Sequence, residues 1–305
     1  MNGYLNVNKP SGMSSAAVVA VIRRLTGEKR VGHAGTLDPD AAGVLPVMTG
    51  KATRLFDYLT DKEKEYRAVV AFGSSTDTQD ASGKVLERGE NYPSLERIRQ
   101  EAEKLTGDIR QKPSAYSAIK VGGKPLYVRA RKGEEAEAPE RTVHIAEIRV
   151  ERETEDHGAE LVVRCGRGTY IRTLCHDLGV LCGCPAHMRS LIRTKSGFFT
   201  LEDALTLEEA REMAAAGTLE SRIIGPDVPL GHLPAVEVPE RFARAVAAGA
   251  KLPAGAILNG EMPAEDVPLR AYLRGAFWGI LVRRGGELVW RAQIAPEKEG
   301  TGACG

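Results

Sequence analysis

The hydrophobic positions of this chain follow two different periods. Alternation of apolar and polar residues indicates half-buried strands, and apolar residues three or four apart indicate helices. Segments of the two kinds do not follow the regular strand–helix order of a parallel sheet, so we expect an α+β fold built on a mixed, mainly antiparallel sheet. The strand pattern covers residues 4–8, 44–48, 66–72, 143–150 and 161–165, and the helical pattern covers residues 15–26, 52–59, 95–105, 169–181 and 207–216.

The last quarter of the chain has a different residue pattern. After Gly225, prolines separate short strand-like runs such as residues 278–282 and 288–292. Because domains average roughly 150 residues, a chain of 305 residues suits two of them. We therefore expect a larger domain over residues 1–230 and a small, mostly β domain over residues 231–305, with a mobile tail at its end.

Positive charge is concentrated in two windows. Residues 109–133 contain seven Lys or Arg and no acid, and residues 161–198 contain six Lys or Arg against the single acid Asp177. The net charge of the whole chain is only +1, so the remainder is acidic. Such patches indicate a local footprint for a polyanion, although a lopsided solvated surface would give the same count. The first window is also Gly-rich and punctuated by Pro, so we interpret residues 109–141 as an insertion that leaves the core.

Several classes of protein are disfavoured by simple features. No run approaches the roughly 18 apolar residues of a membrane span, and the N-terminus lacks the basic and apolar segments of a signal peptide. The five cysteines are odd in number, which disfavours a disulfide framework. Their spacing with His176 and His187 does not form the paired knuckles of a zinc site. We expect a cytoplasmic protein with reduced thiols and no metal.

One loop combines residue types that a purely structural turn rarely needs together. The stretch GHAGTLDPDAAGVLPV, residues 32–47, places Asp38 before a proline and between two glycines, with an apolar strand behind it. The proline restricts the backbone of Asp38, and the glycines permit close approach of another backbone. Asp38 is therefore a candidate nucleophile or base. A turn-forming Asp-Pro-Asp is one alternative, and a glycosidase-type pair of Asp38 with Asp40 is another.

Three further residues could serve the same site. Tyr66 lies at the leading end of a strand, where it could be a core aromatic or a stacking platform for a ring. Arg172 lies near the start of a helix, where a cation opposes the helix dipole. A carboxylate or phosphate partner would explain that position, and a simple surface arginine would also fit. His33 could bind a ligand or lie on the surface.

Six stretches taken together resemble one family. They resemble the TruB-type tRNA pseudouridine-55 synthases of bacteria, over about residues 3–205. The region after residue 230 looks like a PUA-type RNA-binding domain, with much weaker motif content. In chain order the six stretches are GYLNVNKPSGMSS, GHAGTLDPDAAGVLPVMTGKATR, KEYRAVVAFGSSTDTQDASG, KPSAYSAIKVGGKPLYVRARKG, GTYIRTLCHDLG and AHMRSLIRTKSGFFTLEDA.

The resemblance implies an isomerase that converts a uridine of the tRNA T loop to pseudouridine without a cofactor. It implies that Asp38 is the essential carboxylate, that Tyr66 stacks on the flipped base and that Arg172 pairs with the aspartate. It also implies a tRNA T arm as the partner, and we expect a monomer that needs no protein partner and no membrane. Lys9 and Leu191 match other residues that line the pocket of the family. His33 matches a histidine that helps to hold the rearranged T loop, and Tyr170 falls in the same motif as Arg172, so both are expected to bind the substrate.

The basic insertion would then hold the RNA backbone. Phosphate contacts of this kind predict strongly salt-dependent binding. Two alternatives share the same features: a tRNA-folding chaperone with secondary catalysis, and a pseudouridine synthase that acts on another RNA. The cations that we expect to contact phosphates are Lys112, Lys120, Lys124, Arg129, Arg131 and Lys132.

Overall fold

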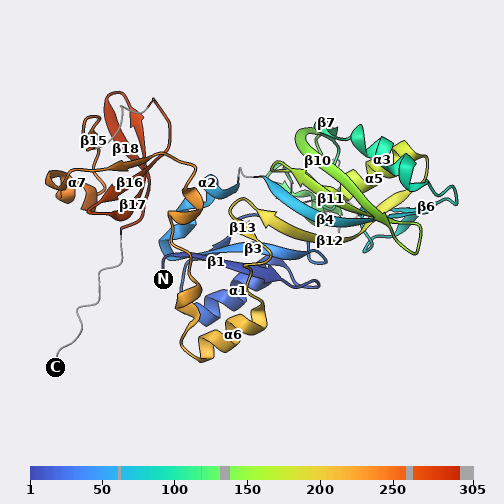
Figure 1. Ribbon diagram of the computed structural model, residues 1–305, viewed down its shortest axis with the longest axis horizontal. Coiled ribbons are helices and arrows are strands. Elements are labelled where there is room, and N and C mark those ends of the chain that lie inside the picture. The colour runs from blue at the N-terminus through green and yellow to red at the C-terminus, as the bar shows by residue number, and fades with distance from the viewer. Residues whose placement is uncertain (61–62, 118, 131–137, 259–263, 296–305) are drawn as a thin grey trace.

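The chain folds into a larger unit around a central sheet and a smaller β unit beside it (Figure 1). The computed structural model describes residues 1–60, 63–117, 119–130, 138–258 and 264–295. Arg131 and Lys132 of the expected insertion, and the expected tail after residue 295, therefore lie outside the described residues.

Nine strands of the described chain form the central sheet. These strands are β1 (Gly3–Lys9), β2 (Val31–His33), β3 (Ala42–Thr49), β4 (Lys64–Phe72), β7 (Gly107–Gln111), β10 (Arg141–Glu153), β11 (Ala159–Cys165), β12 (Ala186–Ser196) and β13 (Phe199–Thr200). The main path runs β1-β3-β12-β4-β11-β10-β7, with β2 beside β3 and β13 beside β12. Along this path β3 and β12 are parallel and the other pairs are antiparallel, so the predicted mixed, mainly antiparallel α+β fold is confirmed.

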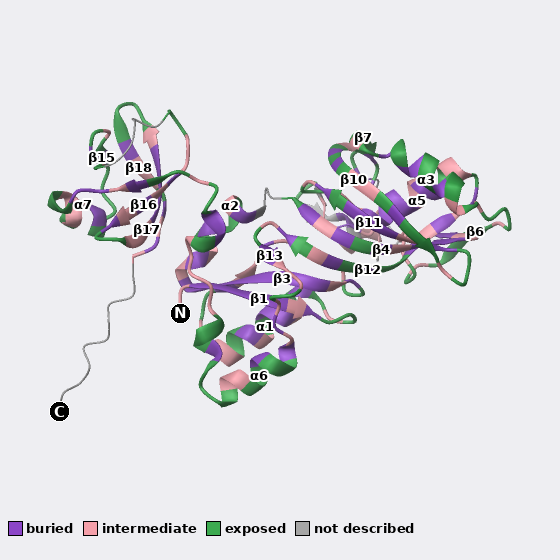
Figure 2. Ribbon diagram, in the orientation of Figure 1, coloured by how far each residue is buried: buried purple, intermediate pink, exposed green. Residues whose placement is uncertain are grey.

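Helices cover the two halves of the sheet separately (Figure 1). The α-helices are α1 (Ser15–Thr26), α2 (Phe56–Thr60), α3 (Leu95–Glu103), α4 (Leu126–Ala130), α5 (Ile171–Cys182), α6 (Leu207–Ala215) and α7 (Ala243–Ala247). Helices α1 and α6 share one apolar core with β1 and β3, whereas α3 and α5 share another with β4, β10 and β11. Figure 2 shows that β1 and β3 are largely buried, whereas the strand β10 toward the other edge is largely exposed and α3 and α6 each expose one face.

Local signals explain where α1 begins and ends. Ser14 accepts a hydrogen bond from the backbone N–H of Ala17 at the start, and Gly27 ends the helix with φ of 67°. Serine and glycine are the residue types favoured at these two positions: the serine hydroxyl pairs a backbone N–H that the first turn leaves unpaired, and glycine adopts the left-handed conformation without steric cost.

Three segments differ from the sequence-based expectation. Residues 52–59 do not form one helix, because they divide between the 3₁₀ helix η1 (Gly50–Leu55) and α2. Residues 73–88, for which the sequence pattern predicted neither strand nor helix, contain the short strand β5 (Ser74–Thr76), which pairs with β6 (Val85–Arg88). The start of the basic insertion is part of the sheet, because its first residues lie in β7 and pair with β10. Short polar strands of this kind carry too little apolar alternation to be recognised in sequence.

The smaller unit has its own five-stranded sheet, in the order β14-β16-β17-β18-β15. Its strands are β14 (Ala235–Glu237), β15 (Leu252–Pro253), β16 (Leu269–Leu273), β17 (Ala276–Arg284) and β18 (Glu287–Gln293). The remaining short elements are β8 (Lys120–Val121), β9 (Lys124–Pro125), η2 (Leu219–Arg222), η3 (Val228–Leu230) and η4 (Glu240–Phe242).

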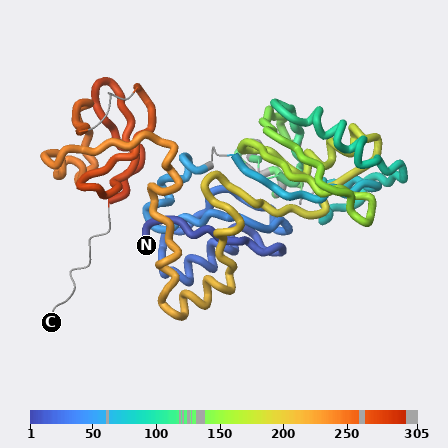
Figure 3. Tube along the Cα trace, viewed as in Figure 1, coloured from blue at the N-terminus to red at the C-terminus, as the bar shows by residue number. Residues whose placement is uncertain are grey.

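The two units are packed against each other. Ile280 and Ile294 of the smaller unit share a buried cluster with Tyr4 and Leu55 of the larger one. Arg54 adds a hydrogen bond from Nη1 to the backbone oxygen of Gln293, at 2.9 Å. Figure 3 shows that the chain between α6 and β14 runs past the N-terminus before it enters the smaller unit. Across the described residues, the helices are all too short or too polar to span a membrane.

Candidate active site

Asp38 lies on a loop that is tied to the start of α1. The loop connects β2 to β3, and the buried hydroxyl of Ser15 holds it by bonding both the backbone N–H and the backbone oxygen of Leu37, at 2.9 and 3.0 Å. The N–H of Ala41 donates to the backbone oxygen of Asp38 at 3.1 Å. The Asp38 side chain remains 42% exposed. A fixed backbone thus presents an accessible carboxylate.

The side chain of Lys9 supports the loop that carries Asp38. Its side chain is fully buried, and Nζ donates to the backbone oxygens of Pro10, Met13 and Pro39 at 3.0, 2.5 and 2.8 Å. Burial lowers the pKa of Lys9 to about 8, although the nearby carboxylates of Asp40 and Asp38 oppose that shift. We expected Lys9 to line the pocket. It instead fixes the backbone next to Asp38, because all three of its donors are used on carbonyl groups.

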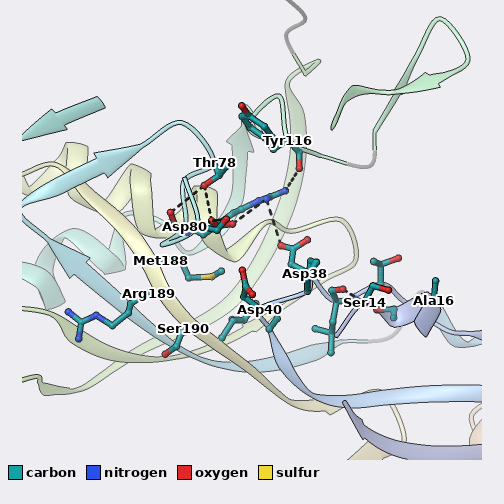
Figure 4. Close-up of a pocket in the computed structure, with 18 of the residues that line it drawn as sticks. Ser14, Ala16, Asp38, Asp40, Thr78, Asp80, Tyr116, Met188, Arg189 and Ser190 are labelled. Carbon is teal, nitrogen blue, oxygen red and sulfur yellow. Dashed lines mark hydrogen bonds and ion pairs between the residues drawn. The ribbon is translucent and has the colours of Figure 1, made fainter. Parts of the chain in front are cut away.

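Arg172 lies in the first turn of α5 and faces Asp38. Its side chain is 6% exposed, and Nη1 lies 3.8 Å from Oδ2 of Asp38 and 3.5 Å from Oδ2 of Asp80. Nη2 donates to the backbone oxygen of Tyr116 at 3.0 Å. Figure 4 shows Thr78, Asp80 and Tyr116 on one side of the cavity and Asp38 on the other, joined by these interactions. The carboxylate partners offset the unfavourable position of a cation at a helix N-terminus.

Two hollows meet at Asp38. The first, of about 520 Å3, is lined by His33, Asp80, Tyr116 and Arg189 among others. The second, of about 270 Å3, lies between the loop and the start of α5. Asp38, Arg172 and Leu191 line both of them. The first volume lies within the range of about 300–1,000 Å3 that is usual for small-molecule sites, and the second lies just below it.

Two tyrosines line the second hollow. Tyr66 on β4 is 7% exposed, and burial raises the pKa of its hydroxyl. Tyr170 precedes α5, and its ring centre lies 5.4 Å from the guanidinium carbon of Arg172 and 5.5 Å from that of Arg141. Two cations this close to an aromatic ring interact favourably with its π electrons. The buried side chain of Gln111 bonds both the N–H and the backbone oxygen of Tyr170, at 3.0 and 3.2 Å.

His33 lies in the wall of the first hollow. Burial, helped by the positive charge of Arg193, lowers the pKa of its imidazole. Its Nδ1 is buried and has no hydrogen-bond partner among the described residues. An imidazole that is neutral at pH 7 and has an unused ring nitrogen is suited to a polar ligand.

Comparison with known proteins shows which family has this arrangement. The family model described as "TruB family pseudouridylate synthase (N terminal domain)" matches residues 23–171, and "tRNA pseudouridylate synthase B C-terminal domain" matches residues 172–226. The chain is 46% identical over 266 residues to the tRNA pseudouridine synthase B of Geobacillus thermodenitrificans (strain NG80-2), covering 85% of this chain and 88% of that protein. It is 47% identical to the protein of the same name from Heliobacterium modesticaldum, covering 82% and 81%.

The chain belongs to the TruB family of pseudouridylate synthases. Solved structures agree with this assignment. A structure titled as a Cbf5-Nop10-Gar1 complex matches 92% of this chain and 78% of its own, with a TM-score of 0.68 and 28% identity. An H/ACA RNP bound to a substrate RNA containing 2'-deoxyuridine matches 96% and 85%, with a TM-score of 0.71 and 26% identity. These matches include the smaller β unit, since they leave too few residues uncovered to omit it.

The basic insertion of this TruB-family chain is described in part. Lys112 is exposed directly after β7, and Arg129 is half-buried in α4. The backbone of Lys120 and Lys124 forms the β8–β9 hairpin. Lys112 and Arg129 do not line either hollow at Asp38.

The fold brings to the site further residues that were not candidates from the sequence. Asp80 lies far from Asp38 in sequence, and the hydroxyls of Thr78 and Ser82 donate to its carboxylate at 2.7 and 2.6 Å. Gln111 and Arg193 were missed as well. A useful signal existed for Asp80, because two aspartates among Thr and Ser residues in STDTQDAS are typical of a self-bonded turn that fixes a carboxylate.

Two of the described cysteines lie in the core between the sheet and α5. Cys165 and Cys175 are buried, and burial raises the pKa of Cys175 to about 12 and that of Cys165 to about 11. Thiols with raised pKa values are poor nucleophiles. They therefore belong to the packing between the sheet and α5.

Proposed function

We propose that this protein isomerises uridine 55 in the T loop of tRNA to pseudouridine, with Asp38 as the essential carboxylate. The names of its relatives support a tRNA substrate. The strongest support for this role of Asp38 is its position. It is an accessible carboxylate on a rigid loop, at the junction of two hollows, and a buried guanidinium lies 3.8 Å away.

The geometry suits a nucleotide that has left its stack. Extruding the base costs a few kcal/mol, and stacking on one aromatic side chain returns about 1–3 kcal/mol. Tyr66 and Leu191 line the smaller hollow, which would take the uracil, while Asp38 faces the ribose from the mouth of that hollow. His33, which lines the larger hollow, would contact a neighbouring nucleotide.

The isomerisation itself conserves all atoms. The bond from N1 of uracil to C1′ breaks, the base turns, and C5 bonds to C1′. C5 then loses its proton while N1 gains one, so the reaction consumes no co-substrate. The contribution of the protein is to hold the detached base and the ribose in register, which requires fixed groups in a closed site. Arg172 would keep the Asp38 carboxylate oriented during these steps.

Binding of the remaining tRNA would use the basic insertion and the smaller unit. We propose that residues 109–141 contact phosphates of the T arm and that residues 231–305 form a PUA-like RNA-binding domain. The excess of Lys and Arg in the insertion supports its contact with phosphates. The five-stranded sheet of the smaller unit is compatible with an RNA-binding domain. We propose that the protein acts as a monomer without a protein partner.

Asp38→Asn tests the proposal most directly. The variant should bind a tRNA T-arm hairpin with near wild-type affinity and form no pseudouridine, measured by chemical mapping of modified positions in a single turnover. Wild-type activity on the hairpin alone would support the T arm as sufficient substrate. Conversion at the wild-type rate by Asp38→Asn would refute the catalytic assignment.

The chaperone alternative predicts a different pattern. A protein whose main task is folding tRNA should refold a misfolded tRNA equally well with Asp38 or Asn at this position. Measuring refolding and conversion on the same preparation separates the two activities. A wild-type protein that converts uridines only in another RNA would instead favour the second alternative.

A further inference from the structure

Arg141 lies where two hollows of the larger unit adjoin. It is the first residue of β10 and lines the second hollow at Asp38, of about 270 Å3. It also lines a third hollow, of about 400 Å3, whose wall is formed by residues 139–143, Arg167 and Gly168. Arg141, Arg167 and Gly168 line both of these hollows. A ligand in the second hollow can therefore extend past Arg141 into the third.

The guanidinium of Arg141 is held in place but has an unused donor. Its central carbon lies 5.5 Å from the centre of the Tyr170 ring. Its Nε is buried and has no hydrogen-bond partner among the described residues. Those residues form no ion pair with it either, and the adjacent carboxylate, that of Glu140, is paired with Arg110. A buried donor without an acceptor is costly, so Arg141 is suited to a ligand that supplies the acceptor.

The turn that follows β11 lies beside Arg141. The N–H of Gly166 donates to the backbone oxygen of His144 on β10 at 2.8 Å, which ties the turn to the strand that carries Arg141. Gly168 has φ of 81°, and an added Cβ there would lie 3.6 Å from Nη1 of Arg141. Between the two glycines, the exposed Arg167 adds a second guanidinium to the lining of both hollows. Guanidinium groups match the geometry of phosphate oxygens, so this site suits a phosphodiester.

The second hollow has an excess of positive charge. The one acid of its described lining is Asp38, which Arg172 faces at 3.8 Å. Such an excess favours the binding of an anion. The bases of the same lining are Lys64, Arg141, Arg167, Arg172 and Arg193.

We propose that Arg141 binds one of the two phosphates that flank the target uridine, in a phosphodiester subsite at the edge of the active site. This inference rests on the function proposed above. With the uracil beside Tyr66 and the ribose at Asp38, the phosphates joined to that ribose are the anions nearest to the second hollow. One of them would supply the acceptor that Nε of Arg141 lacks. The contact would fix the RNA strand at the reacting nucleotide, which the exposed lysines of the insertion cannot do.

Neutral linkages in the RNA test this contact one phosphate at a time. Two T-arm hairpins carry a methylphosphonate at the linkage before or after the target uridine, and two matched hairpins keep the charged linkage. Each pair has a 2′-deoxy sugar next to the linkage, so that no neighbouring hydroxyl cleaves the neutral one. For the wild-type protein, we expect one of the two neutral linkages to weaken binding about tenfold. Arg141→Met should bind the charged hairpin about tenfold more weakly, and the same neutral linkage should then cost less than about twofold.

Arg149→Met is the matched control. Arg149 lies on the same strand, is exposed and is already paired with Glu147 and Glu151. This variant should keep the full effect of the neutral linkage. Loss of the linkage effect in Arg141→Met but not in Arg149→Met supports the proposal. Equal linkage effects in the wild type and Arg141→Met, at both flanking positions, overturn it.

A rate measurement separates phosphate binding from support of the Tyr170 ring. If Arg141 only steadied that ring, Arg141→Met would slow single-turnover conversion of the unmodified hairpin at saturating enzyme and would leave the linkage effect intact. The phosphate contact instead predicts a saturated rate close to that of the wild type and a slope of log affinity against log salt that is smaller by about 0.7–0.9.

Two further provisions keep the test decisive. If Arg141→Met does not fold, as judged by circular dichroism, Arg141→Gln takes its place with the same expected result, because it also lacks the charge. A wild-type protein that binds the hairpin but forms no pseudouridine refutes the proposed function, whereas the linkage comparison still decides the role of Arg141.

Discussion

Nη1 of Arg172 lies 3.5 Å from Oδ2 of Asp80, nearer than the 3.8 Å that separate it from Asp38. Asp80 is itself held by Thr78 and Ser82, so its position does not depend on Arg172. The guanidinium is thus anchored on a carboxylate outside the loop that carries Asp38. The guanidinium of Arg172 can therefore interact with the Asp38 carboxylate while Asp80 keeps it in place.

Replacing Asp80 with Asn should slow the chemical step while tRNA still binds. The amide keeps the shape but removes the charge that anchors Arg172, and small misplacements near a reacting centre cost about 10- to 100-fold in rate. Single-turnover conversion and a binding titration on the same variant measure the two effects. Asp40→Asn, on the exposed side of the loop, should change the rate little, and a total loss there would instead favour the two-carboxylate glycosidase reading.

Gly43→Ala should damage both stability and activity. Gly43 has φ of 101°, and an added Cβ would lie 2.2 Å from the backbone oxygen of Arg193. The left-handed backbone costs roughly 1–2 kcal/mol and the steric conflict about 1–3 kcal/mol more. Gly27→Ala at the end of α1 is the control, because Gly27 is also left-handed but has open space around it. Urea unfolding should rank Gly43→Ala well below Gly27→Ala, and equal losses would contradict the steric argument.

Much of the framework could be predicted from sequence, because the strands around Asp38 and the helix that carries Arg172 have strong periodicity. The loop itself was also recognisable, since Asp38 combines a following proline with flanking glycines. The α+β class and the mainly antiparallel sheet follow from such local patterns. The family resemblance then connected Asp38, Tyr66 and Arg172, which are distant in sequence.

The missing parts are those that depend on cross-strand neighbours. In the sequence, Arg193 is one more basic residue of a positively charged window. Only the strand register, which pairs it with Tyr66, places its side chain in the interior. Gln111 could not be identified from the sequence either, because its hydrogen bonds to Tyr170 join β7 to the residue before α5, which is far away in the chain. Lys9 was assigned to the pocket wall, and its burial under the loop could not be inferred without knowing which carbonyls surround it.

Lys112→Ala should weaken tRNA binding in a salt-dependent manner. Lys112 is exposed next to β7, away from both hollows at Asp38. If it contacts one phosphate, its loss should reduce the slope of log affinity against log salt by about 1 and leave the single-turnover rate at saturation unchanged. Binding titrations from low to moderate salt measure the slope. Lys29→Ala, also exposed but outside the insertion, is the control, and an identical slope for Lys112→Ala and the wild type would refute the contact.

Asp177→Asn should stabilise the protein at neutral pH. Asp177 lies half-buried on α5, and burial raises the pKa of its carboxyl from 3.8 to about 6. Between these two values the folded state binds the proton more tightly than the unfolded state, so wild-type stability falls as pH rises from about 4 to about 6. Above pH 6 the cost is fully present. One pKa unit corresponds to about 1.4 kcal/mol, and with allowance for partial exposure we expect a gain of about 1–2 kcal/mol for Asp177→Asn at pH 7.5.

The pH dependence separates this effect from a general change in packing. The gain from Asp177→Asn should shrink on acidification and become small at pH 4, because the carboxyl is then neutral in the folded state and partly protonated in the unfolded state. Glu202→Gln, at an exposed position, should show no such trend and serves as the control. Urea unfolding of the three proteins at pH 7.5, 5.5 and 4 measures it. A wild type more stable than Asp177→Asn at pH 7.5 would mean that the carboxylate is stabilised in the folded protein, contrary to the raised pKa.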